Sequence, residues 1–203
     1  MNFLKKWIGC IVSFVAGVCG LALSACSGMI AKVKFPDALA TYGLESSTET
    51  TKAFKVLTDS NLYTQAKEMG LGKEFMAMKV FAIITLIVSV LLIAYAIVML
   101  LKNLNVIKLE SKLFGIVGIC LMAALLVSTI GLFVASNNYA SETEKIMKSL
   151  LDAELGVLES MLGISISIKL AITTGFYQPA MLVIAIISAI AVGTFTFLKR
   201  KSA

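Results

Sequence analysis

Residues 7–28 read WIGCIVSFVAGVCGLALSACSG, an uncharged apolar stretch that directly follows Lys5 and Lys6. A helix of about 20 mostly apolar residues is long enough to cross the roughly 30 Å hydrocarbon core of a bilayer. The stretch therefore predicts a membrane-spanning helix. Its position at the start of the chain sets the compartment and the orientation of the segments that follow.

The composition of the whole chain also indicates a membrane protein. Of its 203 residues, 59% are hydrophobic and 15% are charged, whereas soluble domains have roughly 45–50% apolar and about 25% charged residues. Three further apolar stretches reach the length of a span. The four predicted transmembrane helices cover residues 7–28, 75–101, 113–136 and 180–198.

The distribution of charge predicts the orientation of these helices. Segments 1–6, 102–112 and 199–203 together hold eight basic residues and one acid, whereas the two long loops with Lys79 hold ten basic and eleven acidic residues. Lys and Arg concentrate on the cytoplasmic side of spans. Both termini are therefore predicted to be cytoplasmic in a plasma membrane, and loops 29–74 and 137–179 external. The net charge of +6 is assigned to topology and anionic lipid, and no nucleic-acid partner is expected.

The first external loop shows a strand pattern and then a helix pattern. Residues 29–35 (MIAKVKF) alternate at period two, which predicts a strand that is half buried on one face. From about residue 52 to residue 69 apolar side chains recur near a 3.6-residue interval, which predicts a helix. Gly70 and Gly72 interrupt this pattern before the second span.

The second external loop shows the same elements in reverse order. An amphipathic helix is predicted over residues 142–162, with Ser141 and Glu144 at the spacing of a capping box. Residues 164–173 then alternate at period two and are rich in β-branched side chains, which predicts a strand. Its apolar face consists of Ile164, Ile166, Ile168, Leu170 and Ile172. This strand is expected to pair antiparallel with residues 29–35.

The predicted fold is an α-helical membrane protein, in which a four-transmembrane-helix bundle carries a small external α+β cap formed by the two long loops. Residues 102–112 form a cytoplasmic turn between the second and third spans, and residues 199–203 form a cytoplasmic tail. Because a two-stranded ribbon is marginally stable, further strands, the loop helices or a partner would have to complete the cap.

The beginning of the chain resembles the signal peptide of bacterial lipoproteins. A basic start, an apolar stretch and the sequence Leu23-Ser24-Ala25 before Cys26 carry this resemblance, which concerns residues 1–28 only. It implies cleavage that removes residues 1–25 and attachment of lipid to Cys26, so that the N-terminus would be external and lipid-anchored. The alternative is an uncleaved first span. Both readings place Cys26 at the external surface.

Small residues recur every four positions in the first and fourth predicted spans. Such residues allow two helix backbones to approach closely. They predict helix packing, either within the bundle or against another membrane protein. The residues are Gly9, Ser13, Gly17, Gly20, Ser24 and Gly28 in the first span and Ala185, Ala189 and Gly193 in the fourth.

The sequence indicates no catalytic residue, cofactor or metal site. It contains no His, which excludes His-based catalysis and His metal ligands. Lys79 is the one charged residue within the predicted spans, so the charged groups that usually mark ion or proton pathways are missing. Hydroxyl groups in the spans are expected to bond to backbone carbonyls, with an oligomeric pore lined by hydroxyls as the alternative. The acids of helix 142–162 are expected to form a solvated face.

Three functions remain open at this point. The preferred one is a non-enzymatic accessory, scaffold or immunity-type protein of a bacterial plasma membrane, which binds another membrane or external protein, or a second copy of itself, through its cap. The alternative is a subunit of an oligomeric channel or transporter whose pore lies between protomers. The third is an intramembrane enzyme that uses Cys120 or helix 142–162.

Overall fold

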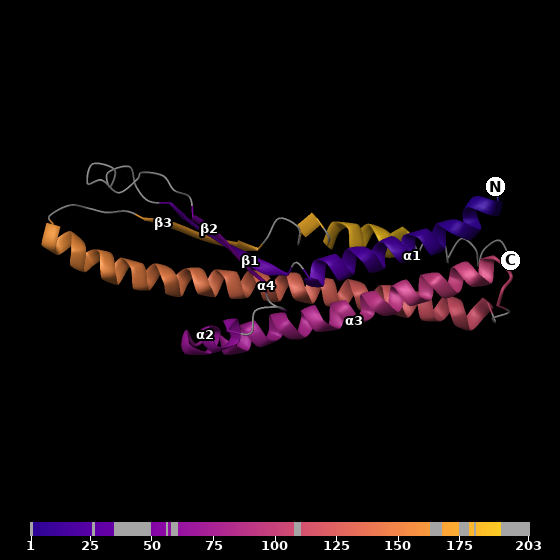
Figure 1. The fold of residues 1–203 in the computed structure, drawn as a ribbon, viewed down its shortest axis with the longest axis horizontal. Coiled ribbons are helices and arrows are strands. Elements are labelled where there is room, and N and C mark those ends of the chain that lie inside the picture. Colours follow the sequence, from indigo (N-terminus) through magenta and orange to yellow (C-terminus); the bar gives the residue numbers. More distant parts are fainter. Residues whose placement is uncertain are drawn as a thin grey trace. The chain divides into compact units, whose positions relative to one another are not determined.

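The structure is a computed structural model, and it describes residues 2–25, 27–34, 50–55, 57, 61–107, 111–162, 168–174, 179–180 and 182–191. These residues form three long helices, two shorter helices and three short strands (Figure 1). The elements are α1 (Asn2–Ala25), β1 (Gly28–Lys34), β2 (Thr50–Lys55), α2 (Leu62–Glu68), α3 (Gly72–Asn103), α4 (Ser111–Leu162) and β3 (Lys169–Thr174). A short apolar helix, Leu182–Ala191, follows β3.

The chain divides into two compact units. The helical unit comprises Met1–Cys26, Lys79–Val134 and Phe176–Ala203, and the α+β unit comprises Ser27–Met78 and Ala135–Gly175. The boundary falls inside α3 and inside α4, so each of these helices contributes one part to each unit.

Three of the described helices are long and apolar enough to cross a membrane. The apolar spans lie in Trp7–Ala25, Gly72–Asn103 and Phe114–Met161, which fits a multi-pass membrane protein. Of the fourth predicted span, 180–198, the structure describes residues 180 and 182–191, of which Leu182–Ala191 form an apolar helix. The rest of that span and the predicted tail 199–203 lie outside the described residues.

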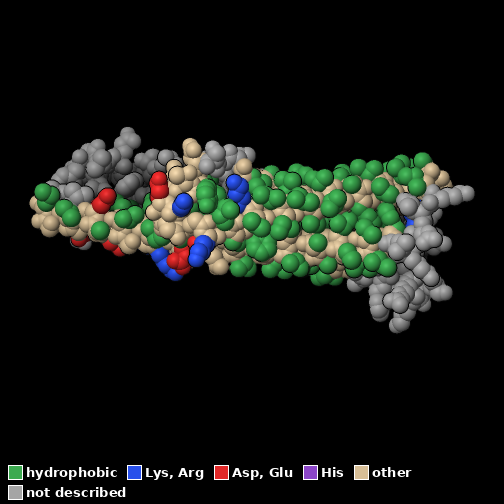
Figure 2. All heavy atoms as spheres, turned by 90° about the horizontal axis from the view of Figure 1, so that it is seen from below, with side chains coloured by type: hydrophobic (Ala, Val, Ile, Leu, Met, Phe, Trp, Pro, Cys, Tyr) green, Lys and Arg blue, Asp and Glu red, His purple; other side chains and the backbone are tan. Residues whose placement is uncertain are grey.

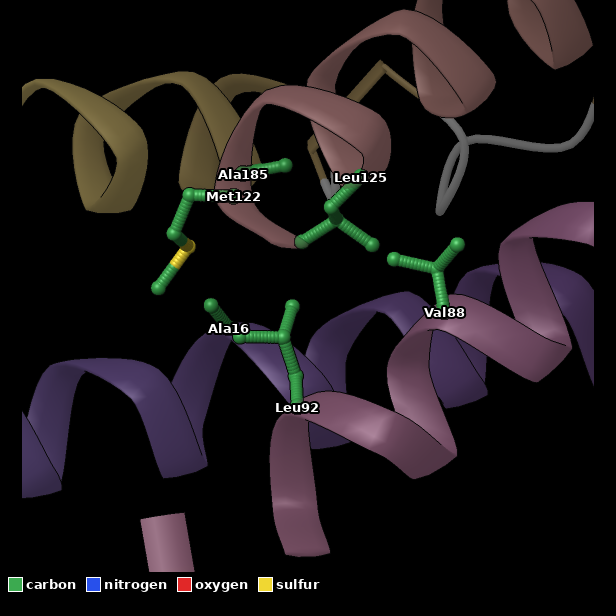
Figure 3. Close-up of a cluster of buried hydrophobic side chains, with 6 residues drawn as sticks. All are labelled: Ala16, Val88, Leu92, Met122, Leu125 and Ala185. Atoms are coloured by element: carbon green, nitrogen blue, oxygen red, sulfur yellow. The ribbon is translucent and has the colours of Figure 1, made fainter. Parts of the chain in front are cut away.

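Four helices meet in the core of the helical unit. Figure 3 shows six buried apolar side chains from these helices pointing toward one another. They are Ala16 of α1, Val88 and Leu92 of α3, Met122 and Leu125 of α4, and Ala185 of the short helix. Van der Waals packing of this kind, with small side chains beside larger ones, is what holds helices together where the surroundings are as apolar as the core.

The outside of the helical unit is apolar as well, as Figure 2 shows for one face. Ile11, Ile87 and Val127 are 56%, 51% and 67% exposed, respectively. Soluble monomers rarely expose apolar patches of this kind. In a bilayer, by contrast, apolar side chains face lipid, and the backbone hydrogen bonds of a helix are made within the helix itself. The apolar exterior thus fits the same membrane assignment as the helix lengths.

Hydroxyl groups inside the helical unit bond to the backbone of their own helices. The Thr85 hydroxyl donates to the Phe81 carbonyl at 2.8 Å and the Ser128 hydroxyl to the Leu125 carbonyl at 3.0 Å. Both residues are buried. An unpaired hydroxyl in apolar surroundings costs several kcal/mol, and bonding back to the preceding turn removes that cost.

α4 is a single helix of 52 residues, Ser111–Leu162. The sequence predicted two separate helices, 113–136 and 142–162, with a cap at Ser141. This prediction was wrong, because the helix continues through residues 137–141. The segment between them, SNNYAS, contains neither Gly nor Pro, and within it Tyr139 and Ala140 are buried, so packing holds the helix together there. At 1.5 Å per residue the helix is about 78 Å long, far more than the roughly 30 Å of a hydrocarbon core.

The α+β unit contains a three-stranded antiparallel sheet with the order β2-β1-β3 (Figure 1). Ala31 of the central strand lies opposite Lys52 of β2 and opposite Ile172 of β3. The predicted antiparallel pairing between the strand after the first span and the strand of the second loop is confirmed.

One predicted boundary in the α+β unit is wrong, and another falls partly outside the described residues. The helix expected over residues 52–69 is wrong in its first part, because β2 occupies Thr50–Lys55 and α2 is confined to Leu62–Glu68. Pairing with β1 overrides the weak helical pattern there, and the two threonines at the start of β2 favour a strand. The predicted strand 164–173 corresponds to β3 in its second half.

A Schellman motif ends α2. The Leu71 N–H donates to the Ala66 carbonyl at 2.7 Å, the Gly70 N–H donates to the Lys67 carbonyl at 3.1 Å, and Gly70 has a φ of 77°. These two bonds satisfy carbonyls that the helix leaves without an internal partner. The motif turns the chain directly into α3, with Leu71 buried beside it.

Replacing Gly70 with alanine is expected to lower the free energy of unfolding by about 1 kcal/mol, because a Cβ disfavours the left-handed conformation. The site itself is open, since no heavy atom lies within 4 Å of the added Cβ. Thermal unfolding in detergent measures the change. Gly70→Asn should lose less, and Gly72→Ala, at a residue without a positive φ, should lose nothing. Equal losses at the two glycines would contradict this explanation.

Candidate functional site

An apolar groove lies in the α+β unit. Its volume is about 370 Å³, and ten residues from β1, α2, α4 and β3 and from the turn after α2 line it. Met29 comes from β1, Leu62 from α2, Met147 from α4 and Ile172 from β3. The groove therefore joins residues from both long segments between the apolar helices.

The alternation of side chains along the strands builds one wall of the groove. Successive side chains of a strand point to opposite faces of a sheet, so Met29 and Ala31 share one face and Ile30 and Lys32 share the other. Ile172, opposite Ala31, lies on the same face as Ala31. Met29 and Ile172 are 6% and 7% exposed, whereas Lys32 is exposed.

An aromatic cluster supports the groove from α3 and α4. The Tyr139 ring, which is 2% exposed, packs edge-to-face on the Phe75 ring with centroids 5.6 Å apart. The Phe75 ring in turn lies 6.1 Å from the ring of Tyr63 in α2. Burial raises the pKa of the Tyr139 phenol, against a smaller lowering by a hydrogen bond with Thr143. Tyr139 therefore presents a neutral, fixed surface to the groove.

The chemistry of the groove suits an apolar guest. Three of its lining residues, Met29, Met69 and Met147, are methionines, whose flexible and polarisable side chains adapt to irregular apolar surfaces. Glu68 is the one charged residue among its described lining residues.

A second, polar hollow of about 580 Å³ lies between α4 and β3. The Ile172 N–H donates to Glu144 Oε2 at 3.3 Å, and the Thr174 hydroxyl donates to Asn137 Oδ1 at 3.3 Å. Ile172 belongs to an outer strand of the sheet. Side chains of α4 thus occupy an edge that would otherwise offer free backbone groups for pairing.

The Glu144 carboxylate is held in its charged form. Lys148 donates to Glu144 Oε1 at 2.6 Å, and this hydrogen bond is the largest cause that lowers the pKa of Glu144 from its ordinary value of 4.5; the Ile172 N–H adds to it. Because the pKa is lower in the folded than in the unfolded chain, the charged form stabilises the fold above about pH 4.5. This stabilisation is lost as the pH falls through the folded value.

Replacing Glu144 with glutamine is expected to remove this acid sensitivity. The free energy of unfolding of the wild-type protein should fall by at most about 1 kcal/mol below pH 4.5, because the ion pair is open to solvent. The free energy of unfolding of Glu144→Gln should not fall in this pH range for this reason. Hydrogen exchange of the Ile172 amide between pH 3 and pH 6, corrected for intrinsic rates, reports the contact directly. Glu142→Gln serves as the control, since Glu142 pairs with Lys145. If Glu142→Gln removed the pH dependence to the same extent as Glu144→Gln, this result would contradict the role of Glu144.

The acids of α4 lie apart from one another or pair with lysines. Within the part of the chain that the structure describes, no group of three or more His, Cys, Asp or Glu residues could hold a metal ion. Glu142 and Glu144 pair with Lys145 and Lys148 at 2.7 and 2.6 Å. Cys120, named by the enzyme hypothesis, is exposed on α4.

The glycines predicted to pack helices lie at contacts of α1. A Cβ built on Gly17 would lie 3.0 Å from the Ser89 carbonyl oxygen of α3, and one on Gly9 would lie 3.0 Å from Met99 Cε. A Cβ on Gly20 would lie 2.8 Å from Leu125 Cδ1 of α4. α1 therefore approaches both neighbours through residues without side chains.

The other predicted packing residues are distributed as follows. Ser13 and Ser24 of α1 and Ala185 are buried, and Ala189 is partly buried. Gly28 begins β1. The predicted residues that lie outside the described ones are Gly193, Ile164 and Ile166, together with Cys26, the predicted lipidation site.

Of the remaining residues of the predicted external strand, Leu170 and Ile172 lie in β3 and are buried, and Ile168 precedes β3. Sequence reasoning did not single out Tyr139, Phe75 or Met69, whereas Met29 and Met147 belong to the predicted strand 29–35 and the predicted helix 142–162. One signal could have indicated the first two: both are aromatic residues at the end of an apolar stretch that leads into or out of a long loop.

No protein-family model, curated protein or solved structure matches the chain. The function proposed below therefore rests on the residues of this chain.

Proposed function

We propose that the chain is a non-enzymatic membrane protein that binds a partner protein through the apolar groove of its α+β unit, in the manner of an accessory, scaffold or immunity-type protein. In this proposal it has four spans with both termini cytoplasmic, and the α+β unit is an external cap on a bacterial plasma membrane. The groove carries the proposal, because it is an apolar hollow in the unit made of the two long loops.

The lining of the groove favours a protein partner over a small polar ligand. A small polar ligand would need several free polar groups in the lining that fix its position. Here Gln65, Glu68 and Thr143 are the polar lining residues, and the Thr143 hydroxyl already donates to the Tyr139 carbonyl at 2.7 Å. An apolar groove with adaptable methionines instead resembles the surfaces that receive an amphipathic helix.

The same structure gives less support to the channel alternative. A pore between protomers would need polar groups on the outer surface of the spans. The hydroxyls of Thr85, Ser128 and Thr129 are buried and bonded within their helices. Within the helical unit, the exposed residues between Val80 and Ile97 of α3 and between Ile116 and Val134 of α4 are apolar.

The fate of the N-terminus is a separate question, which the mass of the intact chain answers. Loss of residues 1–25 together with an added diacyl lipid would show the lipoprotein form. An unmodified N-terminus would show that α1 is the first span.

Site-specific photo-crosslinking in native membranes tests the proposed function. A crosslinker at Gln65, which lines the groove, is expected to give one adduct with a different protein in stoichiometric amount. A crosslinker at Thr64, exposed on the same helix and outside the groove lining, should not. Ala31→Phe, which fills the groove, should abolish the adduct while the fold is retained.

Two outcomes would speak against a partner-binding groove. In the first, Gln65 and Thr64 give the same adducts. In the second, both give adducts with copies of the chain alone, and the purified oligomer conducts ions across liposomes, which would support the channel subunit instead.

A further inference from the structure

The part of α4 beyond the groove exposes a row of large apolar side chains. Met147, Leu150, Val157 and Met161 are 42%, 56%, 60% and 79% exposed; we call these four residues the distal stripe. Met147 also lines the groove, so the stripe continues the groove along the helix. The charged residues Glu142, Glu144 and Lys145 precede it, so it lies beyond the apolar part of α4 that would sit in lipid. In water such a row marks an interaction surface.

The spacing of the distal stripe matches a helical partner. Met147 and Leu150 are three residues apart, Val157 and Met161 are four apart, and Leu150 and Val157 are separated by seven. This is the spacing at which two helices pack side by side. From Met147 to Met161 the stripe extends about 21 Å, or about four turns. A partner helix of this length can place one apolar side chain per turn against the stripe.

Charge decides which kind of helix fits. Glu154 lies in the row of the stripe between Leu150 and Val157, and it is exposed. Residues 150–162 hold three acids and neither Lys nor Arg. The nearest bases in the sequence, Lys145 and Lys148, pair with Glu142 and Glu144. Since a buried carboxylate without a cation is costly, a partner that covers the stripe has to bring positive charge to Glu154.

We infer that the distal stripe binds a basic amphipathic helix of another protein, whose apolar residues face Met147, Leu150, Val157 and Met161 and whose Lys or Arg faces Glu154. The inference rests on the proposed function, because it names the partner of the same continuous surface. A second copy of this stripe would bring three more acids and no base, so like charges would meet. Self-association therefore becomes an outcome of the test.

The test uses the full chain in nanodiscs of phosphatidylcholine, which carry no net charge. The probe is a labelled helical peptide of about 21 residues, or about six turns, with leucines at the spacing of the stripe and lysines beside them. The matched peptide has glutamates in place of the lysines. Fluorescence anisotropy is expected to show the lysine peptide binding about tenfold more tightly than the glutamate peptide.

Two substitutions with the same change of charge separate the stripe from general attraction. Glu154→Lys is expected to reduce the preference for the lysine peptide about tenfold. Asp152→Lys places the same charge two residues away, toward the opposite side of the helix, and is expected to change the preference less than about twofold. Val157→Ser should weaken binding of both peptides.

Three results would overturn the inference: equal binding of the two peptides, equal effects of Glu154→Lys and Asp152→Lys, or disulfide-linked pairs of the chain through Met161→Cys that form under air oxidation even in the presence of the lysine peptide. Failure here and failure of the proposed function remain distinguishable, because Glu154 does not line the groove. If the Gln65 adducts persist and the two peptides bind equally, the groove binds a partner that is not a basic helix. Loss of the adducts would overturn the proposed function itself.

Discussion

Replacing Gly20 with leucine is expected to lower the free energy of unfolding by about 3 kcal/mol. A side chain at Gly20 would overlap the Ser89 hydroxyl of α3 and approach Leu125 Cδ1 of α4 to 2.8 Å. Both Ser89 and Leu125 are buried, so a side chain that rotates away from the leucine has to displace other packed atoms. Overpacking of this kind typically costs 1–3 kcal/mol, and a leucine between two helices lies at the upper end.

Unfolding in mixed micelles measures this effect, with Trp7 as a reporter on α1, because it is the one tryptophan of the chain. Gly115→Leu is the matched control. It makes the same substitution in α4 at a position where an added Cβ meets nothing within 4 Å, and it should change stability by less than about 0.5 kcal/mol. Equal stability of the two variants would mean that α1 does not pack on α3 and α4 through Gly20.

The long apolar helices were predictable because the thickness of a bilayer sets the length of the apolar stretch that crosses it. This length can be read from the sequence without the tertiary structure. The strand at Gly28–Lys34 was predictable for a similar reason, since alternation at period two is a local property. Even its pairing with β3 followed from the order of elements between the apolar stretches. The long helices and this strand share one property: each depends on residues that are adjacent in the chain.

The continuity of α4 and the existence of β2 depend on distant residues and were not predictable. The residues around Asn137 are polar, and a helix that ended there would look the same in sequence; burial of Tyr139 and Ala140 decides that it continues. The six residues of β2 are too few to distinguish a period of two from one of 3.6, and their pairing with β1 decides the conformation.

The groove was not predictable from the sequence for the same reason. It combines Met29 with Leu62, Tyr139 and Ile172, four residues spread over more than half of the chain. Each of them read alone is an ordinary apolar residue of a strand or helix. The sequence did indicate where a binding surface would lie, in the two long loops, because the spans lack charged residues and the loops do not.

Replacing Phe75 with alanine is expected to lower the free energy of unfolding of the α+β unit by about 3–4 kcal/mol. Phe75 is 1% exposed, and its ring contacts Tyr139 on one side and Tyr63 on another. Alanine would remove both ring contacts and leave a cavity that α2 and α4 cannot fill without moving. Hydrogen exchange of α2 and β1, measured on the full chain in detergent, should speed up accordingly.

Met76→Ala is the control for this prediction, because Met76 is the next residue of α3 and is 46% exposed; it should change stability by less than about 0.5 kcal/mol. Since Tyr139 belongs both to the aromatic cluster and to the lining of the groove, Phe75→Ala should also weaken the Gln65 adduct. A variant that loses stability but keeps the full adduct would show that the groove does not depend on the cluster for its shape. Unchanged exchange in α2 would show instead that Phe75 does not hold α2 in place.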